Sequence, residues 1–145
     1  MLYLHPIIAI KYAASGLIFS LLKEFWENID GIKLTIGDTE TELDNYLKRN
    51  KGMSFICLGE NETAGTILCG HDGRRGFIYH LAVHKDYRKK NIAAALIEMS
   101  LDRLRAAGIK RCMIMADDIN ESGKSFWLKM NWRKRDDLKM FSFDL

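Results

Sequence analysis

The sequence has few cysteines, and they form no recognisable motif. Cys57, Cys69 and Cys112 are widely spaced among apolar residues, and no two of them form a CxxC pair. An odd, unpaired set argues against a disulfide framework and favours small buried side chains in a reducing compartment. The four histidines also lack the spacing of zinc ligands. We therefore expect no metal site.

Long apolar runs, strong net charge and linker sequences are also missing. No stretch reaches the roughly 18 apolar residues of a membrane span, and Lys11 interrupts the apolar N-terminus. The net charge is only +3, which argues against non-specific nucleic-acid binding. The single proline, Pro6, lies near the start, and no Pro/Ser-rich linker divides the chain. These absences predict a cytoplasmic protein with a single domain over residues 1–145 and with neither membrane nor specific nucleic-acid partners.

Hydrophobic periodicity predicts an α/β protein. In chain order, the expected elements are an irregular strand over 2–11, helices over 17–29 and 39–49, strands over 54–58, 64–70 and 76–84, a helix over 91–107, a strand over 111–116, a helix over 120–130 and a strand over 138–143. Thr39 and Glu42 have capping-box spacing, and Gly108 suits a left-handed helix end. The order predicts a mixed central sheet with helices on both faces.

The segment most informative about function runs from an apolar strand end into a helix. Leu81-Ala82-Val83 is followed by the cationic turn Arg88-Lys89-Lys90 and by Asn91-Ile92-Ala93 at the helix start. The free N–H groups and the dipole of a helix start favour an anion, and the three cations add positive charge beside it. This design suits a pyrophosphate. From charge alone, a solvated basic loop is the simpler explanation.

Two segments resemble signatures of the GNAT family (GCN5-related N-acetyltransferases). Residues 88–93 are similar to the Arg/Gln-x-x-Gly-x-Gly/Ala signature that opens the main helix of that family. Residues 120–132 resemble a second pattern, Asn-x-x-Ala-x-x-Phe-Tyr-x-x-x-Gly-Phe/Tyr. The motifs stand in the family's order, and the resemblance spans at least Asn50 to the C-terminus. It implies the acyl-CoA N-acyltransferase (GNAT) fold of a small bacterial acetyltransferase.

The resemblance also implies an enzyme that moves the acetyl group of acetyl-CoA (coenzyme A) directly to a primary amine of a small molecule or a protein. The backbone of residues 81–83 would pair with the pantetheine arm, and a strand N–H there would polarise the thioester oxygen. Catalysis would consist of positioning, amine deprotonation and charge stabilisation. The residues that the resemblance assigns to the cofactor are Leu81, Ala82, Val83, Arg88, Lys89, Lys90, Asn91, Ile92, Ala93, Asn120 and Phe126.

Two positions depart from the family patterns. Asn91 stands at the first signature glycine; asparagine tolerates a positive φ, but its side chain obstructs close approach of a phosphate. Trp127 stands where the family commonly has the tyrosine that protonates the leaving thiolate, and an indole cannot supply that proton near neutral pH. Its position in the motif makes Trp127 a candidate catalytic residue. The alternative is that Trp127 is simply a buried aromatic residue on one face of a short helix. The alternative function is a degenerate CoA-binding module that acts through a partner.

The residue that deprotonates the amine stays open among several candidates. Strict alternation puts Tyr79 with Leu81 and Val83 on one face of the strand and His80 on the other. The family places its base, or a water-holding residue, on the first face, which favours Tyr79 as catalytic, although histidine is the better base at pH 7. The acidic pair at 117–118 is a further candidate for holding the substrate ammonium.

The acceptor and the oligomeric state are not fixed by the sequence. In this fold the acceptor site is shaped by the first two helices and their connection, here residues 31–38, which have mixed charge and no ligand motif. The basic cluster over 129–139 lacks interleaved aromatics and a nucleic-acid-binding motif. Edge strands near the C-terminus are compatible with a homodimer.

Overall fold

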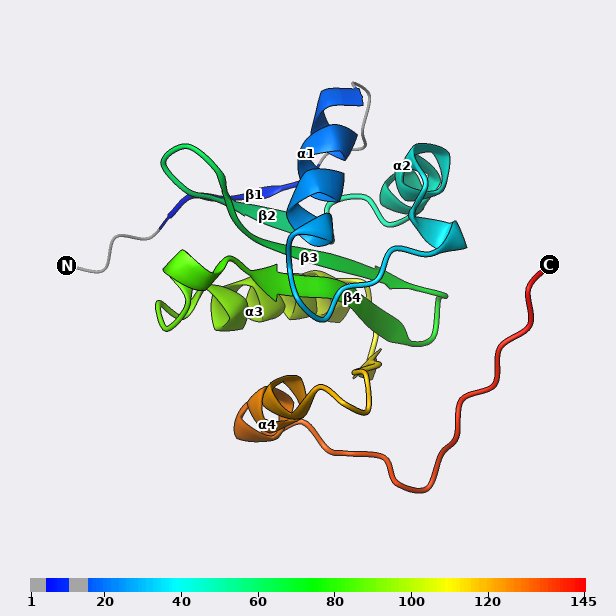
Figure 1. Cartoon of the computed structure of the whole chain (residues 1–145). Helices are drawn as coiled ribbons and strands as arrows, with labels where there is room; N and C mark the ends of the chain where they lie inside the picture. The colour runs from blue at the N-terminus through cyan, green and yellow to red at the C-terminus, as the bar shows by residue number, and fades with distance from the viewer. Residues whose placement is uncertain (1–4, 11–15) are drawn as a thin grey trace. The chain divides into compact units, whose positions relative to one another are not determined.

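A five-stranded mixed sheet forms the centre of the first part of the chain (Figure 1). The computed structural model describes residues 5–10 and 16–145. The strands lie in chain order, with antiparallel pairing from β1 to β4 and parallel pairing between β4 and β5. Their bounds are β1 (Ile7–Ala9), β2 (Phe55–Leu58), β3 (Thr63–His71), β4 (Gly76–Val83) and β5 (Cys112–Ile114).

Helices cover both faces of this sheet, as predicted. The first two helices are α1 (Gly16–Glu27) and α2 (Glu40–Arg49), and α3 (Ile92–Ala106) follows β4. In β3, Thr66 accepts a hydrogen bond from Trp26 of α1, whereas a Cβ at the adjacent Gly65 would meet Ile92 and Leu96 of α3. Because consecutive strand residues point to opposite faces, α1 and α3 lie on opposite sides of the sheet.

The core between the sheet and the first two helices is apolar and closely packed. Leu22, Trp26 and Leu47 are almost fully buried there, and burying one such side chain contributes roughly 1.5–3 kcal/mol. The predicted helix ends are confirmed: Thr39 Oγ1 accepts from the Glu42 N–H at 3.2 Å, and Gly108 has a φ of 79°. Sequence periodicity therefore placed these elements to within a few residues.

Contacts within the chain define two compact units, residues 1–115 and 116–145. The second unit contains α4 (Glu121–Lys129), which Asn120 caps by accepting a hydrogen bond from the Gly123 N–H at 3.0 Å. The expectation of a single domain over the whole chain stays a prediction. Within the described residues, no helix is long and apolar enough to cross a bilayer.

Two predicted strands differ from the structure. The strand expected over 138–143 is absent, and Phe141 and Phe143 are 92% and 88% exposed. A strand needs a neighbour for its backbone N–H and C=O groups, and within the described residues no strand pairs with this segment. The first predicted strand shortens to β1, and part of its expected range lies outside the described residues.

Candidate functional site

The turn before α3 has the backbone form of an anion cradle. Lys89 and Asn91 both have a left-handed φ of 60°, and a turn that contains left-handed residues can direct successive N–H groups toward one side. Asn91 is the N-cap residue of α3, but its side chain makes no capping hydrogen bond. The N–H groups of the first turn have no acceptor within the helix, so they are available to an anion.

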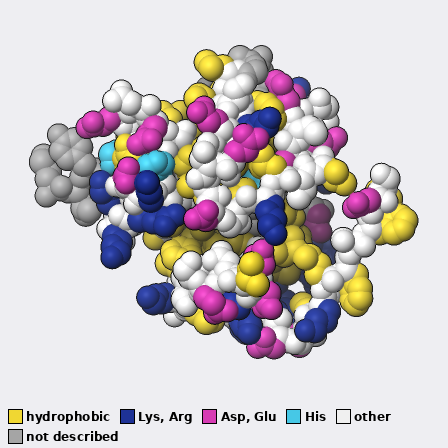
Figure 2. All heavy atoms as spheres, in the orientation of Figure 1, with side chains coloured by type: hydrophobic (Ala, Val, Ile, Leu, Met, Phe, Trp, Pro, Cys, Tyr) yellow, Lys and Arg dark blue, Asp and Glu magenta, His cyan; other side chains and the backbone are white. Residues whose placement is uncertain are grey.

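Positive charge surrounds this helix start. Figure 2 shows Lys and Arg side chains gathered over the turn between the 3-10 helix η2 (Lys85–Tyr87) and α3. Arg88 Nε donates to the Val83 carbonyl oxygen at 3.2 Å, which ties the turn to the end of β4. Lys90 Nζ lies 5.3 Å from the centroid of the Tyr87 ring. The turn thus combines unpaired amides with cations, which is the donor set that a diphosphate requires.

One edge of β4 is open beyond its pairing with β5. The parallel ladder ends at Ile78 and Ile114, while β4 continues to Val83. The His84 N–H donates to the Ala64 carbonyl oxygen of β3 at 2.8 Å. Backbone groups alternate along a strand, so those of Ala82 also face β3, whereas those of Leu81 and Val83 face the open edge. The Val83 carbonyl oxygen accepts from Arg88 Nε, and the other backbone groups of Leu81 and Val83 at that edge are available to an extended, amide-containing ligand arm.

A β-bulge in β4 overturns the strict alternation expected from the sequence. Thr66 lies opposite Ala82 and Leu68 opposite Tyr79, which leaves one extra residue in β4, and His80 has a φ of 49°. Both Tyr79 and His80 consequently contact the helices of the α1–α2 face. Their rings lie 6.3 Å from Tyr46 of α2 and 4.7 Å from Trp26 of α1, respectively.

The bulge brings His80 against an acidic residue from the connection between α1 and α2. The His80 Nε2 and Asp38 Oδ1 atoms are 2.6 Å apart, and the two side chains are 15% and 13% exposed. Asp38 ends the short 3-10 helix η1 (Ile36–Asp38). Sequence reasoning gave Asp38 no role, because 42 residues separate it from His80 and no local pattern joins them.

Tyr79 lies beside this pair and is partly open to solvent. Its side chain stacks on Phe77 with ring centroids 6.3 Å apart, and the residue is 38% exposed. Burial raises the pKa of Tyr79 above its ordinary value. The phenol is therefore protonated at neutral pH and can donate a hydrogen bond, but it is a weak acceptor of a proton.

In the second unit, Trp127 is a packed aromatic residue. It is buried, and its ring centroid lies 5.3 Å from that of Phe126 and 4.6 Å from that of Trp132. Asn131, at the glycine position of the second pattern, has a left-handed φ of 63°. Both signature glycines are thus replaced by asparagine in a left-handed conformation, which asparagine tolerates better than most residues.

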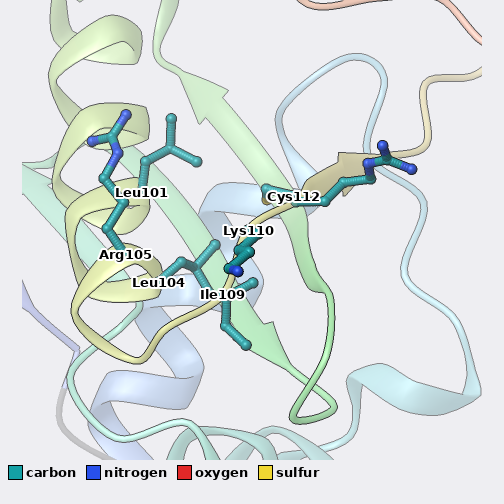
Figure 3. Close-up of a pocket in the computed structure, with 7 residues that line it drawn as sticks. Leu101, Leu104, Arg105, Ile109, Lys110 and Cys112 are labelled. Atoms are coloured by element: carbon teal, nitrogen blue, oxygen red, sulfur yellow. The ribbon is translucent and has the colours of Figure 1, made fainter.

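Two other features are a cluster of possible metal ligands and a hollow beside α3. The side chains of Glu62, His84 and Asp86 lie within metal-ligand reach of one another, with 3.5 Å between His84 Nε2 and Glu62 Oε2 and 3.9 Å between His84 Nδ1 and Asp86 Oδ2. A hollow of about 160 Å³ between the end of α3 and β5 is lined by Leu104, Arg105 and neighbouring residues (Figure 3). It lies at the opposite end of α3 from the anion cradle, roughly 20 Å along a helix that rises 1.5 Å per residue.

Comparison with known proteins identifies related sequences and folds. A sequence model of the acetyltransferase (GNAT) family matches residues 18–132. An acetyltransferase of Sodalis glossinidius is 31% identical over 111 residues, covering 77% of this chain and 78% of that protein. The structure of a Clostridium acetobutylicum acetyltransferase with acetyl-CoA has a TM-score of 0.68 at 16% identity and covers 94% of this chain and 95% of that one. A Streptococcus agalactiae acetyltransferase has a TM-score of 0.71 at 17% identity, covering 95% and 92%.

Proposed function

The chain belongs to the acetyltransferase (GNAT) family and is an acetyl-CoA-dependent acetyltransferase, and we propose that its acceptor is a primary amine of a small molecule or a protein. The structural observation behind the proposal concerns the donor, acetyl-CoA. An anion cradle at the start of α3 follows the open edge of β4 along the chain. A diphosphate and an amide-containing arm are the two parts of coenzyme A that need such partners. Acetyl-CoA supplies an acetyl thioester, an acyl group activated for transfer to an amine.

The residues around the cradle suit the diphosphate. We assign its contacts to the backbone of Asn91, Ile92 and Ala93 and to the cationic side chains of residues 88–90. Leu81 and Val83 are assigned to the pantetheine arm, because their backbone groups face the open edge, and Ala82 is assigned to the strand pairing that holds this edge in place. A backbone N–H at this edge would also polarise the thioester carbonyl. Asn120 and Phe126 of the α4 unit stay predicted cofactor contacts.

The acceptor amine is proposed to bind on the α1–α2 face of β4, where Tyr79 and His80 both point. Its position there would bring the nitrogen toward the thioester carbonyl at the open edge, and positioning supplies a large part of the rate enhancement in such direct transfers. Tyr79 is proposed to hold the acceptor or a water molecule through its protonated hydroxyl. Trp127, at the position of the family's tyrosine, offers a hydrogen-bond donor but no acidic proton.

The cellular setting is part of the same proposal. The three cysteines are free in the structure, which suits a cytoplasmic protein in a reducing environment. A homodimer and the absence of a specific nucleic-acid partner stay predictions, which size-exclusion chromatography with light scattering and a nucleic-acid titration at two salt concentrations would test.

The direct test measures free thiol released from acetyl-CoA in the presence of a panel of aliphatic amines, amino sugars and short peptides. Thiol release that depends on one class of amine, with the N-acetyl product seen by mass spectrometry, is the expected result. Binding of coenzyme A without amine-dependent release from any member would favour the degenerate CoA-binding module instead. Absence of coenzyme A binding in a calorimetric titration would contradict both assignments.

A further inference from the structure

His80 and Asp38 form a contact that is built into the fold. The His80 Nε2 and Asp38 Oδ1 atoms are 2.6 Å apart, and both side chains are about 85% buried. The second carboxylate oxygen of Asp38 accepts from the Thr35 N–H at 2.8 Å and from the Thr35 hydroxyl at 3.2 Å. A carboxylate held on both oxygens offers the imidazole one fixed acceptor, which favours a proton on Nε2 and leaves the Nδ1 lone pair free.

The backbone of His80 is held in an unusual conformation by buried groups. Its φ of 49° lies in the left-handed region, which a non-glycine residue keeps only where the surroundings enforce it. The Thr66 hydroxyl donates to the His80 carbonyl oxygen at 2.9 Å and accepts from Trp26 Nε1 at 2.9 Å. Thr66 and Trp26 are almost fully buried, and the Trp26 ring lies against that of His80. Elements α1, β3 and η1 therefore fix the orientation of one imidazole.

The imidazole is placed next to the open edge of β4. Pairing with β5 ends at Ile78, two residues before His80. Leu81, which lies with His80 in the bulge between the paired residues Tyr79 and Ala82, is assigned to that edge. The side chain of His80 points to the α1–α2 face, where the acceptor is proposed to bind. A base at this point stands between the acceptor side of the sheet and the edge assigned to the thioester.

We propose that His80 is the general base that deprotonates the acceptor ammonium, and that Asp38 is the residue that positions it. The inference rests on the proposed transfer to a primary amine and adds the residue that makes the amine nucleophilic. His80 Nδ1 takes one proton from the ammonium group, and Asp38 stabilises the imidazolium that results. The nitrogen lone pair then forms the C–N bond to the acetyl carbon while the C–S bond breaks and its electron pair leaves on sulfur.

The protons balance without a further reactant. The ammonium nitrogen loses two protons as it becomes an amide nitrogen. His80 takes one and passes it to water. The other leaves the nitrogen once the C–N bond has formed and reaches the departed thiolate through water, which gives the free thiol. The poor acidity of the Trp127 indole is compatible with this scheme because a thiolate, with a parent thiol pKa of about 8.5, leaves without full protonation.

The other candidate bases are weaker bases or already paired. Burial raises the pKa of Tyr79, so its phenol carries its proton at neutral pH. Asp118 is ion-paired with Lys124, with 3.6 Å between its Oδ1 and the ammonium nitrogen, and its backbone oxygen accepts from the same ammonium at 2.6 Å. Among the described residues, His80 alone combines an imidazole, a carboxylate on one ring nitrogen and a place at the bulge of β4.

The first test determines the tautomer of His80 without any turnover. Histidine labelled with ¹⁵N gives ring-nitrogen signals by NMR at pH 8, and the His80→Gln variant identifies the signals of His80 among the four histidines. The expected result is a neutral ring with the proton on Nε2 and a bare Nδ1. A ring protonated on Nδ1 would overturn the inference, because that nitrogen would then have no lone pair for the amine.

The second test compares two kinds of acceptor in the thiol-release assay. An aliphatic amine is protonated at neutral pH and needs a base, whereas an aromatic amine such as an aniline is already neutral. For an aliphatic amine, His80→Gln should lower kcat roughly 100-fold with little change in the KM for acetyl-CoA. For an aniline, the loss should be at least tenfold smaller. Asp38→Asn should show the same selectivity with a smaller loss, and His71→Gln, at the end of β3, is the matched histidine control.

The outcomes separate this inference from the proposed function. A wild-type protein that releases no thiol with any amine would contradict the proposed function and remove the role of the base with it. A wild-type protein that acetylates an aliphatic amine, together with a fully active His80→Gln variant, would overturn the inference alone. Equal losses for the aliphatic and aromatic amines would also overturn it, since they would indicate a structural role for His80.

Discussion

Replacement of Asn91 by glycine tests how well the α3 cradle fits its anion. Asn91 has φ 60° and ψ 18° and makes no capping hydrogen bond, so its side chain contributes little to the helix start. Glycine adopts this conformation without strain, which stabilises the folded state. Glycine also gives the unfolded chain more conformational freedom, which lowers the free energy of unfolding by about 0.4–1 kcal/mol and offsets most of that stabilisation. We expect the melting temperature of Asn91→Gly to stay within roughly 2 °C of the wild-type value.

The affinity for coenzyme A should respond more strongly than the stability. Removal of the side chain lets a phosphate oxygen approach the N–H groups of the first turn of α3. A hydrogen bond to a charged group contributes about 1.5–3 kcal/mol, so restoring part of one should lower the Kd roughly 3- to 10-fold. Isothermal titration with coenzyme A, which cannot transfer an acetyl group, measures this change directly.

A matched variant separates this effect from general backbone freedom. Asn131 has nearly the same φ, 63°, but follows α4 rather than preceding a helix start. Asn131→Gly should leave the Kd for coenzyme A unchanged. Unchanged or weaker binding in a normally folded Asn91→Gly protein would refute the reasoning that the side chain obstructs the cradle.

Four further predictions concern buried groups. Thr66→Val leaves the buried Trp26 indole N–H without its acceptor and should lower the melting temperature by roughly 3–10 °C; a change below 1 °C would contradict the Trp26–Thr66 bond. Burial raises the pKa of Cys69 to about 12 and that of Cys112 to about 11, so Ellman's reagent at pH 8 should titrate three thiols in guanidinium but none rapidly in the native protein. Because the unfolded thiols ionise from about pH 8.5 and the folded ones only at higher pH, stability should fall as pH rises above about 8.5, and Cys69→Ala should weaken this slope. Trp127→Tyr should raise kcat where chemistry limits the rate, and a loss of activity would show that the packed indole is needed for structure.

Local sequence signals predicted the elements that local interactions determine. The capping residue Thr39, the left-handed Gly108 and the limits of β2 to β4 each depend on a few neighbouring residues, and the structure has them close to the predicted positions. The left-handed conformation of Asn91 followed the same logic, because asparagine is the usual substitute for a glycine with positive φ. The mixed sheet with helices on both faces follows from the order of these elements.

Contacts between distant segments decided what the sequence could not predict. The bulge at His80 is held by Trp26 and Thr66, from α1 and β3, and no feature of β4 itself indicates it. The same bulge turns His80 toward Asp38, so strict alternation assigned the histidine to the wrong face. The alternating segment near the C-terminus lacks a paired neighbour among the described residues, and alternation without pairing does not make a strand.

The central claim is that the amides at the start of α3 bind the diphosphate of coenzyme A. A ¹H–¹⁵N NMR titration of the protein with coenzyme A measures those amides one by one. We predict that the amide signals of Asn91, Ile92 and Ala93 shift together and saturate with a single Kd, as expected for charge-assisted hydrogen bonds. Saturation by coenzyme A with these three signals unmoved would contradict the claim.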